Sequence, residues 1–524
     1  MPTLDWIGKK AVINHDKQVP FHLLNEVPEL SYGDKDSGNM LIQGDNLVAL
    51  KSLLPYYAGK VKCIYIDPPY NTGNEGWIYN DNVNSPEIKE WLGNVVGKEA
   101  EDLSRHDKWL CMMYPRLKLL REFLREDGVI FISIDENEHR FLELLMDEIF
   151  GAQNRLSTLV WQNNYGGGAK SKHVVNLHEY IVMFAKNITA VSQIELPPDE
   201  KILKYYKYRD EKFEKRGPYR LQPLATTSMD DRPNLRYPII HNGIEIWPEK
   251  QWYWEKTRTE KAQEQNILVF SNRNGKWTVN YKQYLKDENG VERKSKPYSI
   301  ITEIFTQAGT KEIKDLFGDG KAFDFPKPSE LVKLLISMIT NHGDYVLDSF
   351  AGSGTTAHAV CRLNEEDHKD RRFILVEMGD YANTITAERI RRVIKSNELS
   401  TGFRYYRLGS PLFDEFGNVF SEIKFADLAK HVFFSETGTP LPDSNDLTTP
   451  FIGEYNERGI FLLYNGILKD KNPKNGNVLT REVLAMLPKY DGEKVIYGTG
   501  CRLSDARLKA ERITFKQIPY DLRG

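Results

Sequence analysis

Nearly continuous apolar segments that alternate with helical segments are the feature that most constrains the fold of this chain. Val61–Ile66 and Val129–Ile134 have the composition of strands that are buried on both faces of a sheet. Between and after them, apolar residues recur at helical spacing over Arg105–Glu126 and Glu136–Phe150, and a glycine follows each segment. The sequence therefore predicts an α/β fold with a parallel sheet that helices cover on both faces.

A rigid polar turn follows the first of these strands. It reads Asp67-Pro68-Pro69-Tyr70, and in an open α/β sheet ligands bind outside the carboxyl ends of the strands. The prolines fix two φ angles and leave the carbonyls of Asp67 and Pro68 without neighbouring N–H partners. This array of acceptors suits a planar amine, although a simple strand-ending turn uses the same residue types.

A second candidate site lies far downstream. A strand at Tyr345–Ser349 leads into a loop with Gly352 and Gly354, a helix that opens at Thr355, and a further strand that ends in Glu377. Such glycines let a backbone approach a nucleotide, and an acidic residue at this distance can hold ribose hydroxyls. The third glycine of the dinucleotide fingerprint is absent, which argues against a pyrophosphate and favours a smaller nucleoside. S-adenosylmethionine, which has no phosphates, fits this pattern.

The order of these two sites resembles that of a known family. DPPY followed much later by FAGSGTT resembles the β-class amino-methyltransferases of DNA, whereas glutamine methyltransferases place the cofactor loop before a related Asn-Pro-Pro-Tyr. Asp324–Leu335 resembles the Lys-Pro segment of the DNA family, and Gln43–Leu50 resembles its Gly-Asp segment. LIQGDN, YIDPPYNTG and ISIDENE look most like the methylation (Mod) subunits of Type III restriction-modification systems, over about residues 38–190 and 320–400.

This resemblance implies a Rossmann-like, doubly wound sheet and site-specific methyl transfer from S-adenosylmethionine to N6 of a flipped adenine in double-stranded DNA. Asp at the first tetrapeptide position points to adenine, because relatives that methylate cytosine N4 usually have Ser there. Asp67 and Pro68 are implied to accept hydrogen bonds from the amine, and Tyr70 to stack on the base, with Pro69 completing the turn. The residues that the resemblance places at the cofactor are Asp45, Lys327, Ser329, Asp348, Phe350, Gly352, Gly354, Thr355 and Glu377.

The length of 524 residues predicts two or three domains. Between about residues 190 and 305 helical periodicity fades and aromatic residues interleave with Lys and Arg. This texture favours a target-recognition domain for DNA, but aromatic residues also build the core of small irregular domains. The predicted divisions are an N-terminal arm (1–37), a catalytic half of the methyltransferase core (38–190), a target-recognition insert (191–305), a cofactor half (306–400) and a small C-terminal α/β module (401–524).

Composition limits the possible partners. The net charge of −3 is nearly neutral, so a phosphate-binding surface must be a local patch. The sequence shows no leader and no membrane-spanning apolar stretch, which predicts a cytoplasmic protein without a membrane partner. Four cysteines without zinc-ligand spacing predict buried thiols and no metal site. No GxxxxGK[ST] loop is found, so ATP-driven translocation requires another polypeptide. The Type III resemblance implies a homodimer beside a separate restriction subunit with helicase and nuclease activity, whereas the missing loop is equally compatible with a solitary methylase.

Other functions fit parts of the pattern. A non-catalytic subunit could recognise DNA for a nuclease, but it would have no chemical need for Asp67, Tyr70 and both loop glycines. A nicotinamide oxidoreductase would need a different glycine pattern and an acid–base pair. An RNA adenine or DNA cytosine-N4 methyltransferase would share fold and pocket. The large insert and the Type III resemblance favour DNA, and Asp67 favours adenine.

Overall fold

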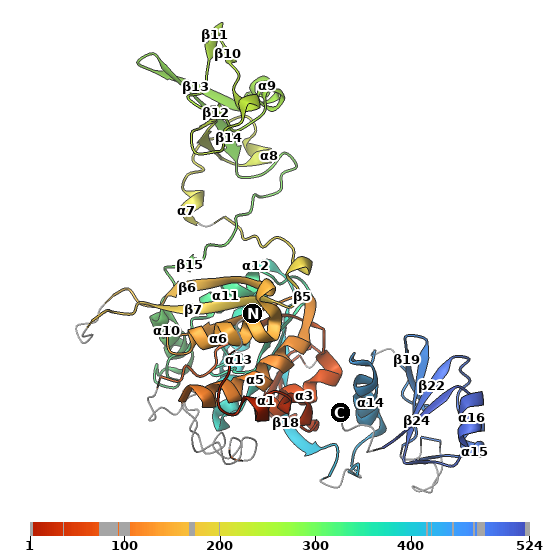
Figure 1. The fold of residues 1–524 in the computed structure, drawn as a ribbon. Helices are drawn as coiled ribbons and strands as arrows, with labels where there is room; N and C mark the ends of the chain where they lie inside the picture. Colours follow the sequence, from red (N-terminus) through yellow and green to blue (C-terminus); the bar gives the residue numbers. More distant parts are fainter. Residues whose placement is uncertain are drawn as a thin grey trace. The chain divides into compact units, whose positions relative to one another are not determined.

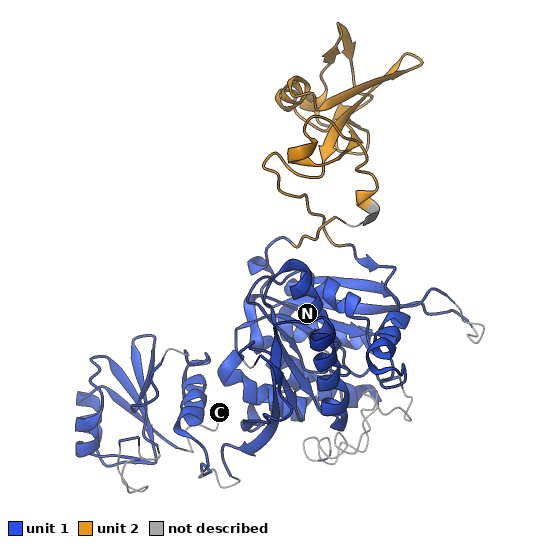
Figure 2. Ribbon diagram, turned by 180° about the vertical axis from the view of Figure 1, so that it is seen from behind, with its two compact units in different colours: residues 1–193, 298–524 blue, residues 194–297 orange. Residues whose placement is uncertain are grey.

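The computed structural model describes residues 4–34, 36–72, 93, 105–166, 173–198, 200–414, 418–420, 422–442, 445–464, 467–468 and 477–518. The chain divides into two compact units, residues 194–297 and the remainder (Figure 2). The smaller unit lies within the predicted insert but is shorter than 191–305. The insert prediction extended too far, because β15 (Ile300–Ile301) pairs with β6 (Arg155–Gln162) and so belongs to the sheet of the larger unit.

The larger unit is built on an 11-stranded sheet with the strand order β1-β18-β3-β17-β16-β4-β5-β7-β6-β15, and β2 pairs with β18. Figure 1 labels β5, β6, β7, β15 and β18 of this sheet. The strands not yet given are β1 (His22–Glu26), β2 (Tyr32–Gly33), β3 (Met40–Gln43), β4 (Val61–Ile66), β5 (Leu124–Ile134), β7 (His178–Ala185), β16 (Tyr345–Asp348), β17 (Arg372–Glu377) and β18 (Gly402–Pro411). All neighbours from β18 to β5 are parallel, as predicted for the core. The edges of the sheet differ. β7 is antiparallel to both β5 and β6, and β1 is antiparallel to β18.

Two groups of helices cover this sheet. In one group α3 packs on α5 and α5 on α6, and in the other α12 packs on α11 and on α13. The crossover from β4 through α5 to β5 runs in the opposite direction along the sheet to that from β16 through α12 to β17, which places the groups on opposite faces. The α-helices that the structure describes in this unit up to residue 396 are α1 (Lys9–Val12), α2 (His15–Gln18), α3 (Asn46–Tyr57), α5 (Arg105–Phe123), α6 (His139–Met146), α10 (Thr306–Phe317), α11 (Ser329–Ser337), α12 (Thr355–Asp367) and α13 (Glu388–Ser396).

Two predicted helix limits were wrong. α5 ends at Phe123 instead of Glu126, because Leu124 already pairs with Val61 in the sheet. α6 begins at His139 instead of Glu136, since the carboxylate of Asp135 accepts the backbone N–H of Asn137 and forms a turn first. Both differences result from contacts between residues, which the periodic pattern of apolar residues does not record.

The two ends of the larger unit differ from the predicted divisions. Residues 1–37 were expected to be an arm, but β1 and β2 extend the sheet by pairing with β18. The C-terminal module was expected from residue 401, but β18 pairs in parallel with β3, so the sheet continues to Pro411.

A smaller sheet follows, with the order β19-β20-β22-β24 and its own buried core. Its elements and those around it are α14 (Phe425–Thr437), β19 (Phe451–Tyr455), β20 (Arg458–Leu462), β21 (Val478–Leu479), α15 (Arg481–Met486), β22 (Glu493–Gly498), β23 (Gly500–Cys501), α16 (Asp505–Ala510) and β24 (Ile513–Gln517). In the described parts of the chain no helix is long and apolar enough to cross a membrane.

The unit of residues 194–297 combines a three-stranded sheet, β13-β14-β8, with two two-stranded sheets. Trp252 is buried in the core of this unit, as the core interpretation of its aromatic residues predicts, whereas Trp247 and Tyr253 are exposed. Contact of the exposed rings with DNA stays a prediction. Its elements are α7 (Glu200–Leu203), α8 (Phe213–Arg216), β8 (Tyr219–Pro223), β9 (Ala225–Thr226), β10 (Ile239–His241), β11 (Ile244–Ile246), β12 (Gln251–Trp252), α9 (Lys256–Glu264), β13 (Leu268–Arg273) and β14 (Lys276–Tyr284).

Candidate active site

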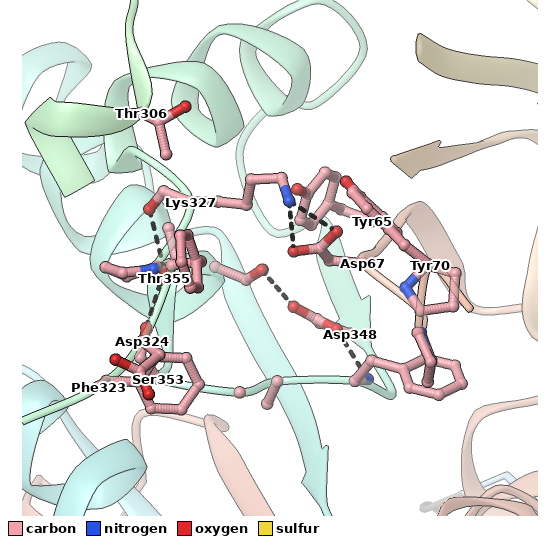
Figure 3. Close-up of a pocket in the computed structure, with 18 of the residues that line it drawn as sticks. Tyr65, Asp67, Tyr70, Thr306, Phe323, Asp324, Lys327, Asp348, Ser353 and Thr355 are labelled. Atoms are coloured by element: carbon pink, nitrogen blue, oxygen red, sulfur yellow. Dashed lines mark hydrogen bonds and ion pairs between the residues drawn. The ribbon is translucent and has the colours of Figure 1, made fainter. Parts of the chain in front are cut away.

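A cavity of about 250 Å³ lies where the strand order of the large sheet switches direction. β4 and β16 are neighbours, and their crossovers lead away from each other, which is where open α/β sheets bind ligands. The cavity is therefore between the two sites that the sequence suggested (Figure 3). Its lining residues are Tyr65, Asp67, Pro68, Pro69, Tyr70, Glu179, Thr306, Phe323, Asp324, Phe325, Pro326, Lys327, Asp348, Phe350, Ala351, Gly352, Ser353, Thr355 and Thr356.

The tetrapeptide is fixed from behind by buried groups. The indole N–H of Trp109, on α5, donates to the carbonyl oxygen of Pro69 across 2.6 Å. Asn71, buried with φ of 56°, donates from Nδ2 to the carboxylate of Glu138 and to the backbone oxygen of Arg105. A hydrogen bond to Pro69 from outside the cavity means that this carbonyl is not the acceptor presented to a ligand. The turn is therefore held in one orientation by side chains that do not line the cavity.

Asp67 takes part in a charged cluster inside the cavity. The ammonium of Lys327 donates to both carboxylate oxygens of Asp67, at 3.0 and 2.9 Å (Figure 3). The same Nζ lies 3.6 Å from the Oε2 of Glu179 and 4.6 Å from the ring centroid of Tyr70. The hydroxyl of Tyr70 donates to Oε2 of Glu179 at 2.9 Å. One cation thus stands between two carboxylates and over an aromatic face.

Burial and charge act in opposite directions on this cluster. Burial raises the pKa of Asp67, and the nearby Lys327 opposes that rise. For Lys327 burial lowers the pKa, but the carboxylates of Asp67 and Glu179 outweigh burial, so its pKa is raised. Burial also raises the pKa of Tyr70, which keeps its phenol protonated. The ammonium of Lys327 and the hydroxyl of Tyr70 are therefore stable hydrogen-bond donors here.

The glycine loop after β16 favours glycine at two positions. Gly352 has φ of 52° and Gly354 φ of 82°, which L-residues adopt at a cost. A Cβ at Gly354 would stand 3.0 Å from the backbone oxygen of Thr386, which is tighter than most such contacts, whereas one at Gly352 would stand at an ordinary 3.4 Å from the ring of Phe323. At Gly352 the loop therefore passes close to Phe323, which lines the cavity.

Two buried carboxylates hold this loop in shape. Asp348 accepts the N–H of Phe350 at 2.9 Å and the hydroxyl of Thr356. The two oxygens of Glu377 accept the N–H groups of Gly352, at 2.7 Å, and Gly379, at 2.8 Å. Burial raises the pKa of Asp348 to about 7 and also raises the pKa of Glu377. Both carboxylates are thus tied to the backbone of the loop.

A second network joins the Lys-Pro segment to the same loop. The hydroxyl of Thr355 donates to the backbone oxygen of Lys327 at 3.2 Å. Arg389, which is fully buried on α13, donates to the hydroxyls of Ser353 and Thr355 and to the carboxylate of Glu312 at 2.8 Å or less. The position of Lys327 in the cavity is therefore coupled to the conformation of the glycine loop.

The cavity brings together most of the residues that the sequence singled out. All four tetrapeptide residues line it, as do five of the cofactor residues: Lys327, Asp348, Phe350, Gly352 and Thr355.

Asp45, Ser329, Gly354 and Glu377 are not among the lining residues. Asp45 caps α3 and forms an ion pair with Arg116, and the buried hydroxyl of Ser329 donates to Glu312 at 2.8 Å. Cofactor contact by these four, and by the five that line the cavity, stays a prediction.

Three important side chains were missed. Glu179 lies near the start of β7, and because β7 is antiparallel to β5 its first residues reach the edge where the parallel strands end. A carboxylate that opens an otherwise apolar strand is the signal that could have identified it. Trp109 carries no such signal, because an aromatic residue in an apolar segment is usually part of the core. Phe323 lies in the mostly polar stretch 318–328, where no periodic pattern marks it. Within the described residues no cluster of His, Cys, Asp or Glu could hold a metal ion.

Comparison with known proteins places the chain in a family. The sequence-family model of the N6/N4 DNA methylases matches residues 61–388 of this chain. The chain is 33% identical to the Type III restriction-modification enzyme StyLTI Mod subunit of Salmonella typhimurium, with 87% of this chain and 73% of the relative covered. It is also 33% identical to the EcoP15I Mod subunit of Escherichia coli, over 94% of this chain and 85% of the relative. The Type II methyltransferase M.KpnI of Klebsiella pneumoniae is 31% identical to this chain, and the match covers 68% of this chain and 84% of the relative.

Solved structures are more distant. The PvuII DNA methyltransferase, which is cytosine-N4-specific, is 13% identical with a TM-score of 0.35 and covers 68% of this chain and 89% of its own. TTHA0409 of Thermus thermophilus, solved with S-adenosyl-L-methionine, is 15% identical with a TM-score of 0.32. The match covers 71% of this chain and 99% of TTHA0409. The family match and the Mod relatives carry the assignment: this chain belongs to the DNA methylases that methylate exocyclic amino groups with S-adenosylmethionine.

Proposed function

We propose that this chain is the modification subunit of a Type III restriction-modification system and methylates N6 of a flipped adenine in double-stranded DNA. The observation that carries the proposal is the cavity in which Asp67, Pro68 and Tyr70 face the glycine loop after β16. The identity to three Mod subunits over 83% or more of this chain supports the Type III assignment.

The chemistry of the cavity fits S-adenosylmethionine. Four carboxylates line it, from Asp67, Glu179, Asp324 and Asp348, against the single ammonium of Lys327. Even with Asp348 partly protonated, this excess of negative charge favours a sulfonium and disfavours a pyrophosphate. The rings of Phe323 and Phe350 offer apolar walls for an adenine, and Gly352 admits a ligand close to the backbone. When bound, the cofactor supplies an activated methyl group.

The residues of the chain then have to bind and orient the amine. The lone pair of an exocyclic adenine amine is delocalised into the ring, so the nitrogen is a poor nucleophile. The Asp67 carboxylate and the Pro68 carbonyl, as acceptors for its two hydrogens, favour a pyramidal nitrogen whose lone pair points away from the ring. The hydrogen bond of Trp109 to Pro69 supports this role, since it fixes the carbonyl of Pro69, the residue that follows Pro68. Positioning and electrostatics supply the rate enhancement.

The base must leave the duplex to reach this cavity, at a cost of a few kcal/mol. Stacking on Tyr70 returns roughly 1–3 kcal/mol, which does not favour flipping by itself. Contacts to the DNA backbone have to supply the remainder, and residues 194–297 are the proposed source. Exposed Tyr205, Trp247 and Tyr253 in that unit are candidates for contact with DNA.

The partners follow from the same assignment. A Mod subunit is by name one part of a Type III enzyme, so we propose that a restriction subunit with helicase and nuclease activity assembles with this chain. We further propose a homodimer and a cytoplasmic location, where chromosomal and invading DNA are both accessible. Co-purification of the chain with the restriction subunit, and its mass in solution, test these proposals.

Mapping of modified bases tests the function as a whole. Genomic DNA from cells with and without this gene is sequenced for N6-methyladenine and N4-methylcytosine. The proposal expects N6-methyladenine at one short motif only when the gene is present. N4-methylcytosine at a motif, or methylated RNA with unmodified DNA, contradicts it.

A further inference from the structure

The ammonium of Lys327 occupies the place that the target amine needs. It donates to both oxygens of Asp67 and lies 4.6 Å from the ring centroid of Tyr70. An amino group that donates to Asp67 while its purine stacks on Tyr70 requires the same space. Lys327 must therefore leave Asp67 before methyl transfer.

A displaced ammonium in this cavity needs another partner. The side chain of Lys327 is only 11% exposed, and an unpaired buried charge costs several kcal/mol. Oε2 of Glu179 is 3.6 Å from the same nitrogen, so an ammonium that rotates away from Asp67 can form a charge-assisted hydrogen bond to Glu179. Glu179 is the second carboxylate within ion-pair distance of Lys327 among the described residues.

Glu179 is itself held in place. Its Oε1 accepts from Nδ2 of Asn163 at 2.9 Å, and its Oε2 accepts from the hydroxyl of Tyr70 at 2.9 Å. The backbone oxygen of Asn163 in turn accepts both the N–H and the hydroxyl of Thr306 at 3.0 Å. A fixed carboxylate beside the long side chain of Lys327 is suited to receive the ammonium without a rearrangement of the strands.

We infer that Glu179 is a positioning residue that receives the Lys327 ammonium when the target amine replaces it on Asp67. This inference rests on the proposed function and deepens it. Lys327 then has two positions in the reaction cycle. In the free enzyme it neutralises Asp67, and with DNA bound it lies on Glu179, where its charge no longer competes with the amine.

A double-mutant cycle tests this role. Glu179→Gln keeps the size of the side chain and can still hydrogen-bond Tyr70 and Asn163, but it removes the charge that attracts Lys327. Single-turnover methyl transfer to unmethylated plasmid DNA is measured at saturating S-adenosylmethionine. We expect Glu179→Gln to slow transfer about tenfold or more, with the Kd for S-adenosylmethionine changed less than threefold. Glu179→Asp, which keeps the charge, is expected to restore part of the rate.

The second arm removes the lysine. In a Lys327→Met background, Glu179→Gln is expected to have almost no further effect on the rate, because no ammonium remains to be received. If Glu179→Gln lowers the rate of methyl transfer by the same factor in the wild-type and Lys327→Met backgrounds, the inference is overturned, since Glu179 would then act only through Tyr70. An unchanged rate for Glu179→Gln also overturns it.

Controls separate this outcome from other failures. Glu126→Gln removes a largely exposed carboxylate on β5 of the same unit and is expected to leave the rate unchanged. Urea unfolding of every variant shows whether the fold is intact, and Glu179→Asp provides a rate if Glu179→Gln does not fold. A wild-type chain that binds S-adenosylmethionine but methylates no DNA overturns the proposed function, and the inference with it. An active wild type with equal penalties overturns the inference alone.

Discussion

Trp109 donates its indole N–H to the carbonyl oxygen of Pro69 across 2.6 Å, and the indole is completely buried. Trp109→Phe keeps an aromatic ring but leaves that carbonyl without its donor. An unsatisfied buried acceptor costs about 1–3 kcal/mol, so we expect the free energy of unfolding to fall by this amount in urea titrations. Because the tetrapeptide loses its support, the rate of methyl transfer should fall about tenfold.

Tyr464→Phe is the matched control for this variant. It removes a hydroxyl that donates to the backbone oxygen of Ile423 at 3.1 Å in the core of the C-terminal sheet. We expect a similar loss of stability with an unchanged rate of methyl transfer. Equal losses of rate in both variants would mean that Trp109 acts through general stability alone.

The buried carboxyl of Asp348 should make stability depend on pH. Burial, with smaller contributions from Asp67 and Glu377, raises its pKa from 3.8 to about 7 in the folded protein. The folded chain then keeps a proton that the unfolded chain releases, so this contribution to stability is complete below about pH 4 and is lost as the pH rises to about 7. Asp348→Asn stays neutral, so its stability relative to wild type should increase by at least about 1 kcal/mol between pH 5 and 8. Parallel pH curves for the two proteins in urea unfolding would refute this assignment.

Gly354 and Gly318 allow backbone strain to be separated from steric contact. Their φ angles, 82° and 79°, are almost equal. A Cβ at Gly354 meets the backbone oxygen of Thr386 at 3.0 Å, whereas one at Gly318 meets nothing within 4 Å. We expect Gly318→Ala to cost about 1 kcal/mol of unfolding free energy and Gly354→Ala to cost more. Gly354→Ala alone should also weaken binding of S-adenosylmethionine, measured by calorimetry.

Arg389 should control the affinity for the cofactor without lining the cavity. It holds Ser353, Thr355 and Glu312 with one planar guanidinium, which a lysine cannot replace. Arg389→Lys is expected to destabilise the fold by about 3 kcal/mol and to raise the KM for S-adenosylmethionine roughly tenfold. Arg392→Lys, on the same helix but 41% exposed, is the control and should change stability by less than about 1 kcal/mol. Equal KM values for the two variants would show that the Arg389 network does not shape the loop.

Local patterns were sufficient for the elements that form the centre of the site. The limits of β4 and the start of α12 at Thr355 agree with the sequence predictions. Each depends on neighbouring residues, an apolar segment in one case and a glycine turn in the other. The two predicted halves of the site then meet because β4 and β16 are adjacent in the sheet.

Contacts between distant residues could not be predicted in this way. Glu179 reaches Tyr70 across 109 positions of the sequence, and Trp109 reaches Pro69 across 40. The strand β1 is part of the sheet only because it pairs with β18, at the other end of the core. Such pairings depend on the order and direction of strands, which no periodicity within one segment records.

Methyl transfer by the wild-type chain and by Asp67→Ala measures the role of Asp67. Both are incubated with unmethylated plasmid DNA and S-adenosylmethionine that carries an isotopically labelled methyl group, and the nucleosides are then separated by mass. We expect labelled N6-methyladenine from the wild type, none from Asp67→Ala, and cofactor affinities that differ only a few-fold. Substantial labelled N6-methyladenine from Asp67→Ala would show that Asp67 does not orient the target amine.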